Sequence, residues 1–260
     1  MRRSDKRPAP RMRRRPTGSK ALQAQSAAEL RSTARRGDAI LLNLAIPAGL
    51  LVFFSAVKVL PLPAGVQHPV DFLAPGLLAL AVMSSSMVSL GIATGFERQY
   101  GVLKRLGSTP LGRPKLLAAK IVAIAAVEIF QVAVLAGIAV AFGWRPGGPV
   151  ALAALALLAG TAAFAGLGLL MAGSLRGEVT LAAANGLYLL LLLLGGMLFP
   201  ISDLPAVLRY TAEALPSGAL SQVLHSTLSA GAAQSAGSWL VLVGWAVAAP
   251  TAAARTFRWE

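Results

Sequence analysis

One acidic side chain in this largely apolar chain is placed where it could carry a proton or line a path for a solute. Glu128 lies roughly ten residues into the apolar run that starts near residue 116, which in a helix corresponds to a depth of about 15 Å. A carboxylate at that depth in a bilayer is costly, so we expect it to face protein or water rather than lipid. Gln131 follows one helical turn later on the same face. We interpret the pair either as a substrate-path or gating element or as interhelical hydrogen-bond partners.

A second group of residues would suit hydrolysis. Ser217-Gly218 and His225 lie near one another in sequence, and a histidine that activates a serine is the basis of serine hydrolases. However, the serine lacks a preceding Gly-x context, and both residues fall in a loop between apolar runs rather than at depth on two spans. A membrane-embedded hydrolase is therefore the weakest of the functions considered.

Other catalytic and cofactor-binding motifs are missing from the sequence. There is no cysteine, and the two histidines, His68 and His225, belong to no metal-ligand motif. The sequence has no Gly-x-x-x-x-Gly-Lys-Ser/Thr loop, so it cannot bind ATP in the P-loop manner. We predict no catalytic residue, no metal site and no cofactor on this chain, which by itself is not an enzyme.

A charged segment, residues 96–120, separates two long apolar runs. Its apolar positions are Phe96, Tyr100, Leu103 and Leu106. This spacing places them on one face of a helix, with the charged residues mostly elsewhere, and Gly107 and Pro110 then end the helix. The pattern predicts a short amphipathic helix at a membrane surface, which is either a passive anchor or a docking surface for a soluble partner.

Residues of this segment resemble the signature of ABC-2 type transporter permeases, most closely that of daunorubicin-resistance-type exporter subunits. The matching residues are Glu97-Arg98, Gly101, Leu103-Lys104-Arg105-Leu106, Thr109-Pro110-Leu111 and the later Lys120. In that family the loop is the cytoplasmic coupling helix that touches the ATPase subunit. The resemblance therefore implies these ATPase-coupling residues: Phe96, Glu97, Arg98, Tyr100, Gly101, Leu103, Lys104, Arg105 and Pro110.

The resemblance also implies partners and a function. Two copies of this permease, or two related permeases, would work as a homodimer or heterodimer with an ABC ATPase subunit that binds ATP and Mg²⁺. Because the predicted spans offer few charged groups, we expect the exported substrate to be an amphiphilic drug or lipid-like molecule. The alternative is a proton-coupled secondary transporter that uses Glu128. We expect no nucleic-acid partner, despite a net charge of +14.

The elements that must position these residues are transmembrane helices. The chain is 56% hydrophobic and only 13% charged, and its apolar residues gather in runs of about twenty, the length that crosses a bilayer. We predict an all-α membrane protein with six spans, at residues 39–60, 72–95, 116–142, 150–173, 179–199 and 236–254. Gly91 and Gly95 predict close helix packing, within the fold or between subunits. Asn185, a polar residue of the fifth span, is expected to bond to another helix or to line the substrate path.

The remaining segments are predicted to lie outside the bilayer or at its surface. Residues 1–20 form a basic tail that is expected to be disordered, and residues 21–37 favour an interfacial helix. The transmembrane domain then covers residues 38–260. Two short helices punctuated by proline, after Pro205 and Pro216, are predicted to be re-entrant or extracellular.

The distribution of basic residues predicts the orientation. If the N-terminus is inside, 21 of the 24 Lys and Arg residues fall on the inner side and 3 on the outer side. This bias supports six spans with both termini in the cytoplasm. The expected location is the inner, cytoplasmic membrane of a bacterium, with residues 96–120 on the side where an ATPase could reach them.

Overall fold

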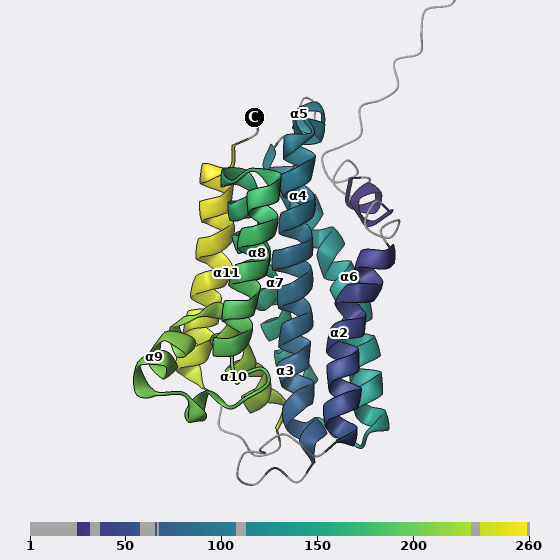
Figure 1. The fold of residues 1–260 in the computed structure, drawn as a ribbon, viewed down its shortest axis with the longest axis vertical. Helices are drawn as coiled ribbons and strands as arrows, with labels where there is room; N and C mark the ends of the chain where they lie inside the picture. Colours follow the sequence, from purple (N-terminus) through teal and green to yellow (C-terminus); the bar gives the residue numbers. More distant parts are fainter. Residues whose placement is uncertain are drawn as a thin grey trace, which may run out of the picture.

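The computed structural model of the protein describes residues 25–31, 37–57, 66, 68–107, 113–229 and 235–258. Within these ranges the chain is a bundle of helices and contains no strand (Figure 1). The predicted tail, residues 1–20, lies outside the described residues. Of the interfacial helix predicted over residues 21–37, the structure describes a helix at residues 25–31.

Long helices run side by side along one axis, and short helices lie at both ends of the bundle (Figure 1). The elements are α2 (Gly37–Ala56), α3 (Pro69–Met83), η1 (Ser84–Ser89), α4 (Leu90–Gln99), α5 (Val102–Gly107), α6 (Arg113–Ala141), α7 (Val150–Ser174), α8 (Gly177–Leu194), η2 (Ile201–Asp203), α9 (Ala206–Ala214), α10 (Pro216–Leu228) and α11 (Ala236–Thr256). We call the end that carries α5 the α5 end, and the opposite end, which carries α9 and α10, the α10 end (Figure 1).

Among the residues that the structure describes, five helices are long and apolar enough to cross a membrane. They are Pro69–Gln99, Lys115–Ala141, Val150–Ser174, Gly177–Leu194 and Ala236–Thr256. The first of these joins α3, η1 and α4 end to end, while the apolar part of α2, Asn43–Ala56, is shorter. The all-helical, multi-pass class predicted from the sequence is thus supported, and the count of six spans stays a prediction.

Small residues let the central helix α7 approach its neighbours closely. A Cβ atom at Gly166 would lie 2.4 Å from the backbone nitrogen of Pro250 in α11. A Cβ atom at Gly91 in α4 would lie 3.0 Å from the Cα of Gly168 in α7. The close packing predicted for Gly91 and Gly95 therefore occurs within the chain, where Gly95 faces Thr180 of α8.

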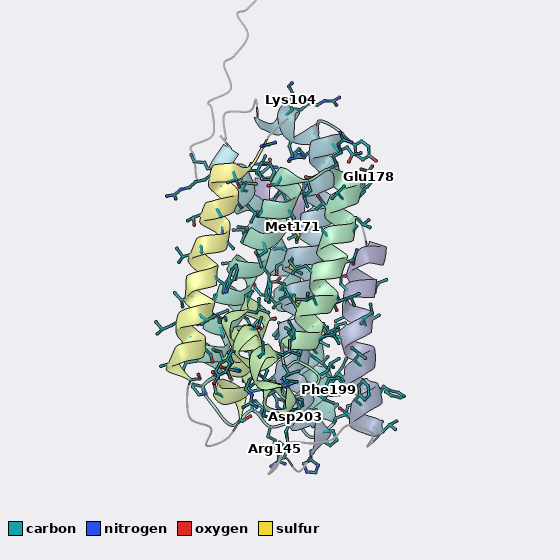
Figure 2. The ribbon with its side chains drawn as sticks, turned by 60° about the vertical axis from the view of Figure 1, so that its left-hand side comes forward. Lys104, Arg145, Met171, Glu178, Phe199 and Asp203 are labelled. Carbon is teal, nitrogen blue, oxygen red and sulfur yellow. The ribbon has the colours of Figure 1, made fainter. Side chains whose placement is uncertain are left out.

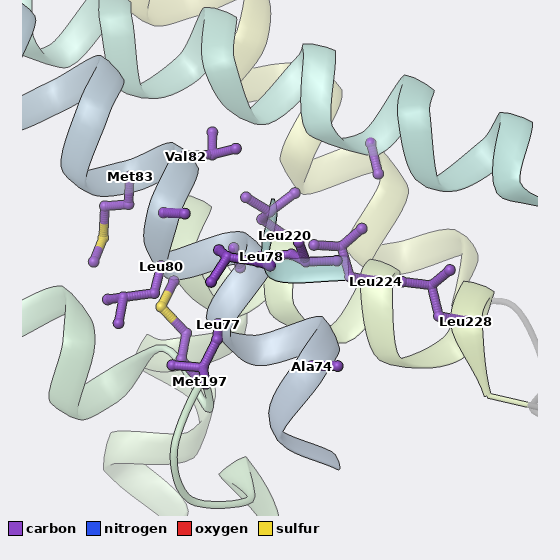
Figure 3. Close-up of a cluster of buried hydrophobic side chains, with 14 of the residues drawn as sticks. Ala74, Leu77, Leu78, Leu80, Val82, Met83, Met197, Leu220, Leu224 and Leu228 are labelled. Atoms are coloured by element: carbon purple, nitrogen blue, oxygen red, sulfur yellow. The ribbon is translucent and has the colours of Figure 1, made fainter. Parts of the chain in front are cut away.

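The largest apolar cluster lies between α3 and α10 and extends to α2, α6, α7 and α8. Leu77 and Leu80 of α3 face Met197, and Leu220 and Leu224 of α10 pack beside the same helix (Figure 3). These side chains are buried. The α10 end is therefore held together by contacts between segments that are far apart in the sequence.

A π-helix, η1, interrupts the span formed by α3 and α4. Turns of a π-helix are wider than those of an α-helix, are rare in proteins and often mark functional sites. The hydroxyl of Ser85 donates to Gln131 of α6 at 2.6 Å, and Ser84 donates to Asn43 of α2 at 3.4 Å. The amide of Asn43 donates in turn to Ser89. Side chains of α2 and of α6 thus form hydrogen bonds with η1.

The helix α8 is shorter than the sequence predicted. It ends at Leu194 instead of residue 199, because Gly196 has a φ of +65° that favours glycine and turns the chain toward η2. The hydroxyl of Ser221 in α10 donates to the carbonyl oxygen of Gly196 at 2.9 Å. The two short helices α9 and α10 follow, close to the positions expected from their prolines.

Candidate functional site

The charged segment lies at the α5 end of the bundle, the end at which Figure 2 labels Lys104 and Glu178. The sequence predicted a single amphipathic helix beginning at Phe96. The structure instead continues the transmembrane helix α4 to Gln99 and starts a separate helix, α5, at Val102. Gly101 separates the two helices, with a φ of +71° that few other residues adopt readily. This glycine, which the resemblance marked, is therefore the corner of the segment.

The corner changes which side chains share a face. Leu103 is fully buried against Leu116 and Leu117 in the cluster near the α5 end, whereas Tyr100 is 69% exposed. The rings of Phe96 and Tyr100 are stacked, with centroids 6.1 Å apart. The expectation of one continuous apolar face was wrong, because the turn at Gly101 rotates α5 relative to α4. Tyr100 is left on the surface.

A buried lysine joins three elements of this site. The ammonium of Lys120 in α6 lies 2.6 Å from a carboxylate oxygen of Glu97 in α4 and 2.9 Å from one of Glu29, which belongs to the helix at residues 25–31. The Lys120 side chain is only 2% exposed, and both carboxylates are largely covered. An ammonium removed from water in this way needs close counter-charges. Lys120 therefore ties α4, α6 and the N-terminal helix together.

Arg98 ties the end of α4 to the end of α7. Its guanidinium donates to the carbonyl oxygens of Gly173 and of Leu175, the latter at 2.7 Å. The last carbonyl groups of a helix have no partner within the helix, and a cation there also interacts favourably with the helix dipole. The chain end takes part as well, because the amide of Arg258 donates to Gly173 at 3.1 Å.

Gln99 makes a second connection to the turn between α7 and α8. Its side-chain amide donates to the carboxylate of Glu178 at 2.8 Å, and its side-chain oxygen accepts from the backbone amide of Gly177 at 2.8 Å. A Cβ atom at Gly177 would lie 2.3 Å from that same oxygen. Together with Arg98, Gln99 fixes the end of α4 against the start of α8.

The other predicted coupling residues divide into two groups. Lys104 and Arg105 of α5 are exposed, which suits either contact with a partner or simple solvation. Pro110 lies outside the described residues. Their role in ATPase coupling stays a prediction.

The carboxylate predicted to lie at depth is buried between helices. Glu128 is 4% exposed, and one of its oxygens accepts a hydrogen bond from the hydroxyl of Thr161 in α7. Gln131, fully buried on the same helix, accepts from Ser85. The second oxygen of Glu128 and the amide nitrogen of Gln131 have no hydrogen-bond partner among the described residues. The pair therefore connects α6 to α7 and to η1, as the hydrogen-bond interpretation expected, and the substrate-path role stays a prediction.

We expect Glu128→Gln to leave efflux within about twofold of the original protein, because an amide oxygen can still accept from Thr161. Glu128→Leu removes that interhelical bond and is expected to cost about 1 kcal/mol of stability. Efflux and thermal unfolding of the purified protein measure the two effects. If Glu128→Gln abolished efflux while the protein stayed folded, the proton-carrier alternative would be favoured instead.

Asn185 does not form the bond to another helix that one hypothesis expected, its place on the substrate path stays a prediction, and the candidate hydrolytic pair does not form. Asn185 is exposed and donates to the carbonyl oxygen of Leu181 in its own helix, so it joins no other helix within the described chain. The ring nitrogens of His225 lie 2.7 Å from the carbonyl oxygen of Ser221 and 2.9 Å from that of Phe72. His225 is thus engaged away from Ser217, and no serine–histidine pair of the proposed kind forms.

Two residues of the site were not predicted from the sequence, and a third was noticed but was given no function. Gln99 and Glu29 carried no signal, since a lone polar residue in a helical stretch has no distinctive spacing. Lys120 was part of the family resemblance but received no role. The only sign of its role was its position near the start of an apolar span. A lysine in that position more often extends its side chain toward the membrane interface than pairs with carboxylates.

Comparisons with known proteins agree on the class of this chain. The sequence profile described as "ABC-2 type transporter" matches residues 20–227. A protein of Bacillus subtilis (strain 168), YvfS, is 28% identical over 204 residues, which cover 75% of this chain and 80% of that protein. YvfS is named as a transport permease. Both matched stretches are long enough to take in most of the helical bundle.

Proposed function

The chain belongs to the ABC-2 type transporter family, and from this premise we propose that it forms the membrane path of an exporter driven by a separate ABC ATPase. The matched family model is that of the transporter's membrane permease. We propose that two permeases, identical or related, assemble with the ATPase in the cytoplasmic membrane of a bacterium. Six spans with both termini inside, and a substrate of the amphiphilic, daunorubicin-resistance type, complete the proposal.

The observation that carries the proposal is the way the α5 end is braced. Lys120 links α4 to α6, while Arg98 and Gln99 link α4 to the turn between α7 and α8. Force applied to α5 would therefore reach three long helices through short polar contacts. An arrangement of rigid helices with a few fixed contacts can transmit a rigid-body movement over the length of the bundle. Closure of the ATPase subunits would supply that force.

This proposal predicts that α5 lies in the cytoplasm and touches the ATPase. Because the sequence contains no cysteine, Lys104→Cys is expected to react with a membrane-impermeant maleimide only in inside-out vesicles. Arg145→Cys, at the opposite end of the molecule (Figure 2), is the matched control and should react only in intact cells. Labelling of Cys at position 104 from outside would refute both the orientation and the coupling role.

Capture of the ATPase subunit tests the same surface more directly. Affinity purification of the permease in mild detergent is expected to retain an ABC ATPase. A photo-crosslinker placed at the exposed Tyr100 should join the two chains. The same crosslinker at Tyr210 of α9 should not join them, because Tyr210 is equally exposed but lies at the α10 end.

A further inference from the structure

A cavity of about 880 Å³ opens at the α10 end of the molecule, away from the braced site. Its walls come from the start of α3, the loop between α6 and α7, the segment around η2, and α10. Its lining includes Asp71, Phe72, Trp144, Arg145, Ser221 and Gln222. Cavities of this size commonly hold small molecules. On the orientation proposed above, this end faces the outside.

The cavity is held open by hydrogen bonds between its walls. His225 of α10 is bonded to the carbonyl oxygen of Phe72 in α3 at 2.9 Å. Ser221 of α10 donates to the segment that precedes η2, at Gly196. The amide of Gly147, in the loop between α6 and α7, donates to Leu228 of α10 at 2.9 Å. Every wall is thus fixed to α10, so the cavity is formed before a ligand arrives, and little ordering would oppose binding.

The lining separates apolar and charged groups. Trp144, Phe72 and Leu228 are buried and contribute apolar surface, while the charged lining residues are the exposed Arg145 and the half-buried Asp71. These are the charged residues of the lining among those that the structure describes, and their formal charges cancel. An aromatic ring also attracts an ammonium group through its π electrons. A ligand that matches these features has an apolar part, an ammonium and an oxyanion.

We propose that this cavity binds a zwitterionic amphiphile. Its ammonium would lie toward Asp71 and Trp144, its oxyanion toward Arg145, and its apolar part against the buried aromatic wall. A guanidinium favours phosphate and carboxylate oxygens, which suits the oxyanion. The inference goes beyond the transport cycle, because binding needs only the folded permease and no ATPase. Lipids of the outer leaflet and exported amphiphiles share this head-group chemistry.

The test uses the purified permease in maltoside micelles and short-chain probes that differ in head-group charge. Dihexanoyl phosphatidylcholine is expected to raise the melting temperature more than dihexanoyl phosphatidylglycerol or dodecyltrimethylammonium. Arg145→Glu should weaken zwitterion binding at least about tenfold, as expected for loss of a charge-assisted contact, and should favour the cationic probe. Asp71→Lys should shift the preference toward the anionic probe.

Controls separate the proposal from general detergent effects. Arg209→Glu makes the same charge change on the exposed surface of α9, outside the cavity lining, and should leave all three affinities unchanged. Melting without ligand checks that each variant is folded. Equal responses to the three probes, or an equal shift in Arg209→Glu, would overturn the proposal. Mass spectrometry then distinguishes the sources: retained phospholipid that is lost in Arg145→Glu identifies a leaflet lipid, and its absence identifies a site for exported amphiphiles.

Discussion

Lys120→Met is expected to loosen the α5 end and to reduce ATPase capture severely. The substitution keeps the length of the side chain but leaves the carboxylates of Glu29 and Glu97 without their shared cation. Removing one partner of a buried ion pair typically costs about 3–5 kcal/mol. Because both carboxylates keep some contact with solvent, we expect a smaller loss of about 2 kcal/mol here. Thermal unfolding, ATPase co-purification and efflux would measure the three consequences.

Two further variants identify the cause of that loss. Lys115→Met changes an exposed lysine of the same helix and should alter stability by less than about 0.5 kcal/mol. The triple variant with Lys120→Met, Glu29→Gln and Glu97→Gln removes all three charges of these ion pairs and should recover part of the stability. If the Lys120→Met variant had the melting temperature of the unchanged protein and captured the ATPase normally, the ion pairs of Lys120 with Glu29 and Glu97 would have no role in bracing α4.

Comparing Glu29→Gln with Glu97→Gln separates the effects of the two ion pairs that Lys120 forms. Glu97→Gln removes the charge from the ion pair between α4 and α6 and weakens that link, so it should reduce ATPase capture and efflux together. Glu29→Gln weakens the ion pair that holds the N-terminal helix to Lys120, and we expect capture to stay near the original level. Equal losses in both variants would mean that the N-terminal helix is also needed to position α5.

On the face of α7 that packs against α11, Gly166→Ala is expected to destabilise the bundle more than any other substitution that adds a single methyl group. The new Cβ atom would lie 2.4 Å from the backbone nitrogen of Pro250 and 2.6 Å from the carbonyl carbon of Ala249. Backbone atoms cannot rotate away, so the two helices must separate. Overpacking of this kind costs about 1–3 kcal/mol, and we expect the melting temperature to fall by about 5 °C.

The effect should also reach the α5 end. The chain continues from α11 into Phe257, which is buried against Gly173, and Arg258 bonds to the same glycine. Displacement of α11 would therefore disturb the helix end that Arg98 holds. Gly137→Ala in α6 is the matched control, because nothing lies within 4 Å of its Cβ position. A similar fall in melting temperature for both variants would show that added volume alone, and not contact with α11, is responsible.

Local sequence signals determined the class of this protein. Long apolar runs require helices, because a bilayer leaves backbone polar groups no other partner over such a length. The charged segment at residues 96–120 and the proline-punctuated stretch before the last span were also visible, since charge and proline act on the chain where they occur. Even here the boundary at Leu194 was missed, because Gly195 and Gly196 end a helix that apolar composition alone would extend.

Tertiary structure alone decided how those segments act on one another. The bond from Gln99 to Glu178 and the junction of Lys120 with Glu29 join residues that no periodicity relates. The cavity at the α10 end likewise draws its walls from four separate stretches. A repeating pattern reports which face of a helix is apolar, but the identity of the opposing residue depends on how the helices pack. For this reason the sequence marked the charged segment at residues 96–120, and only the folded bundle revealed what holds it in place.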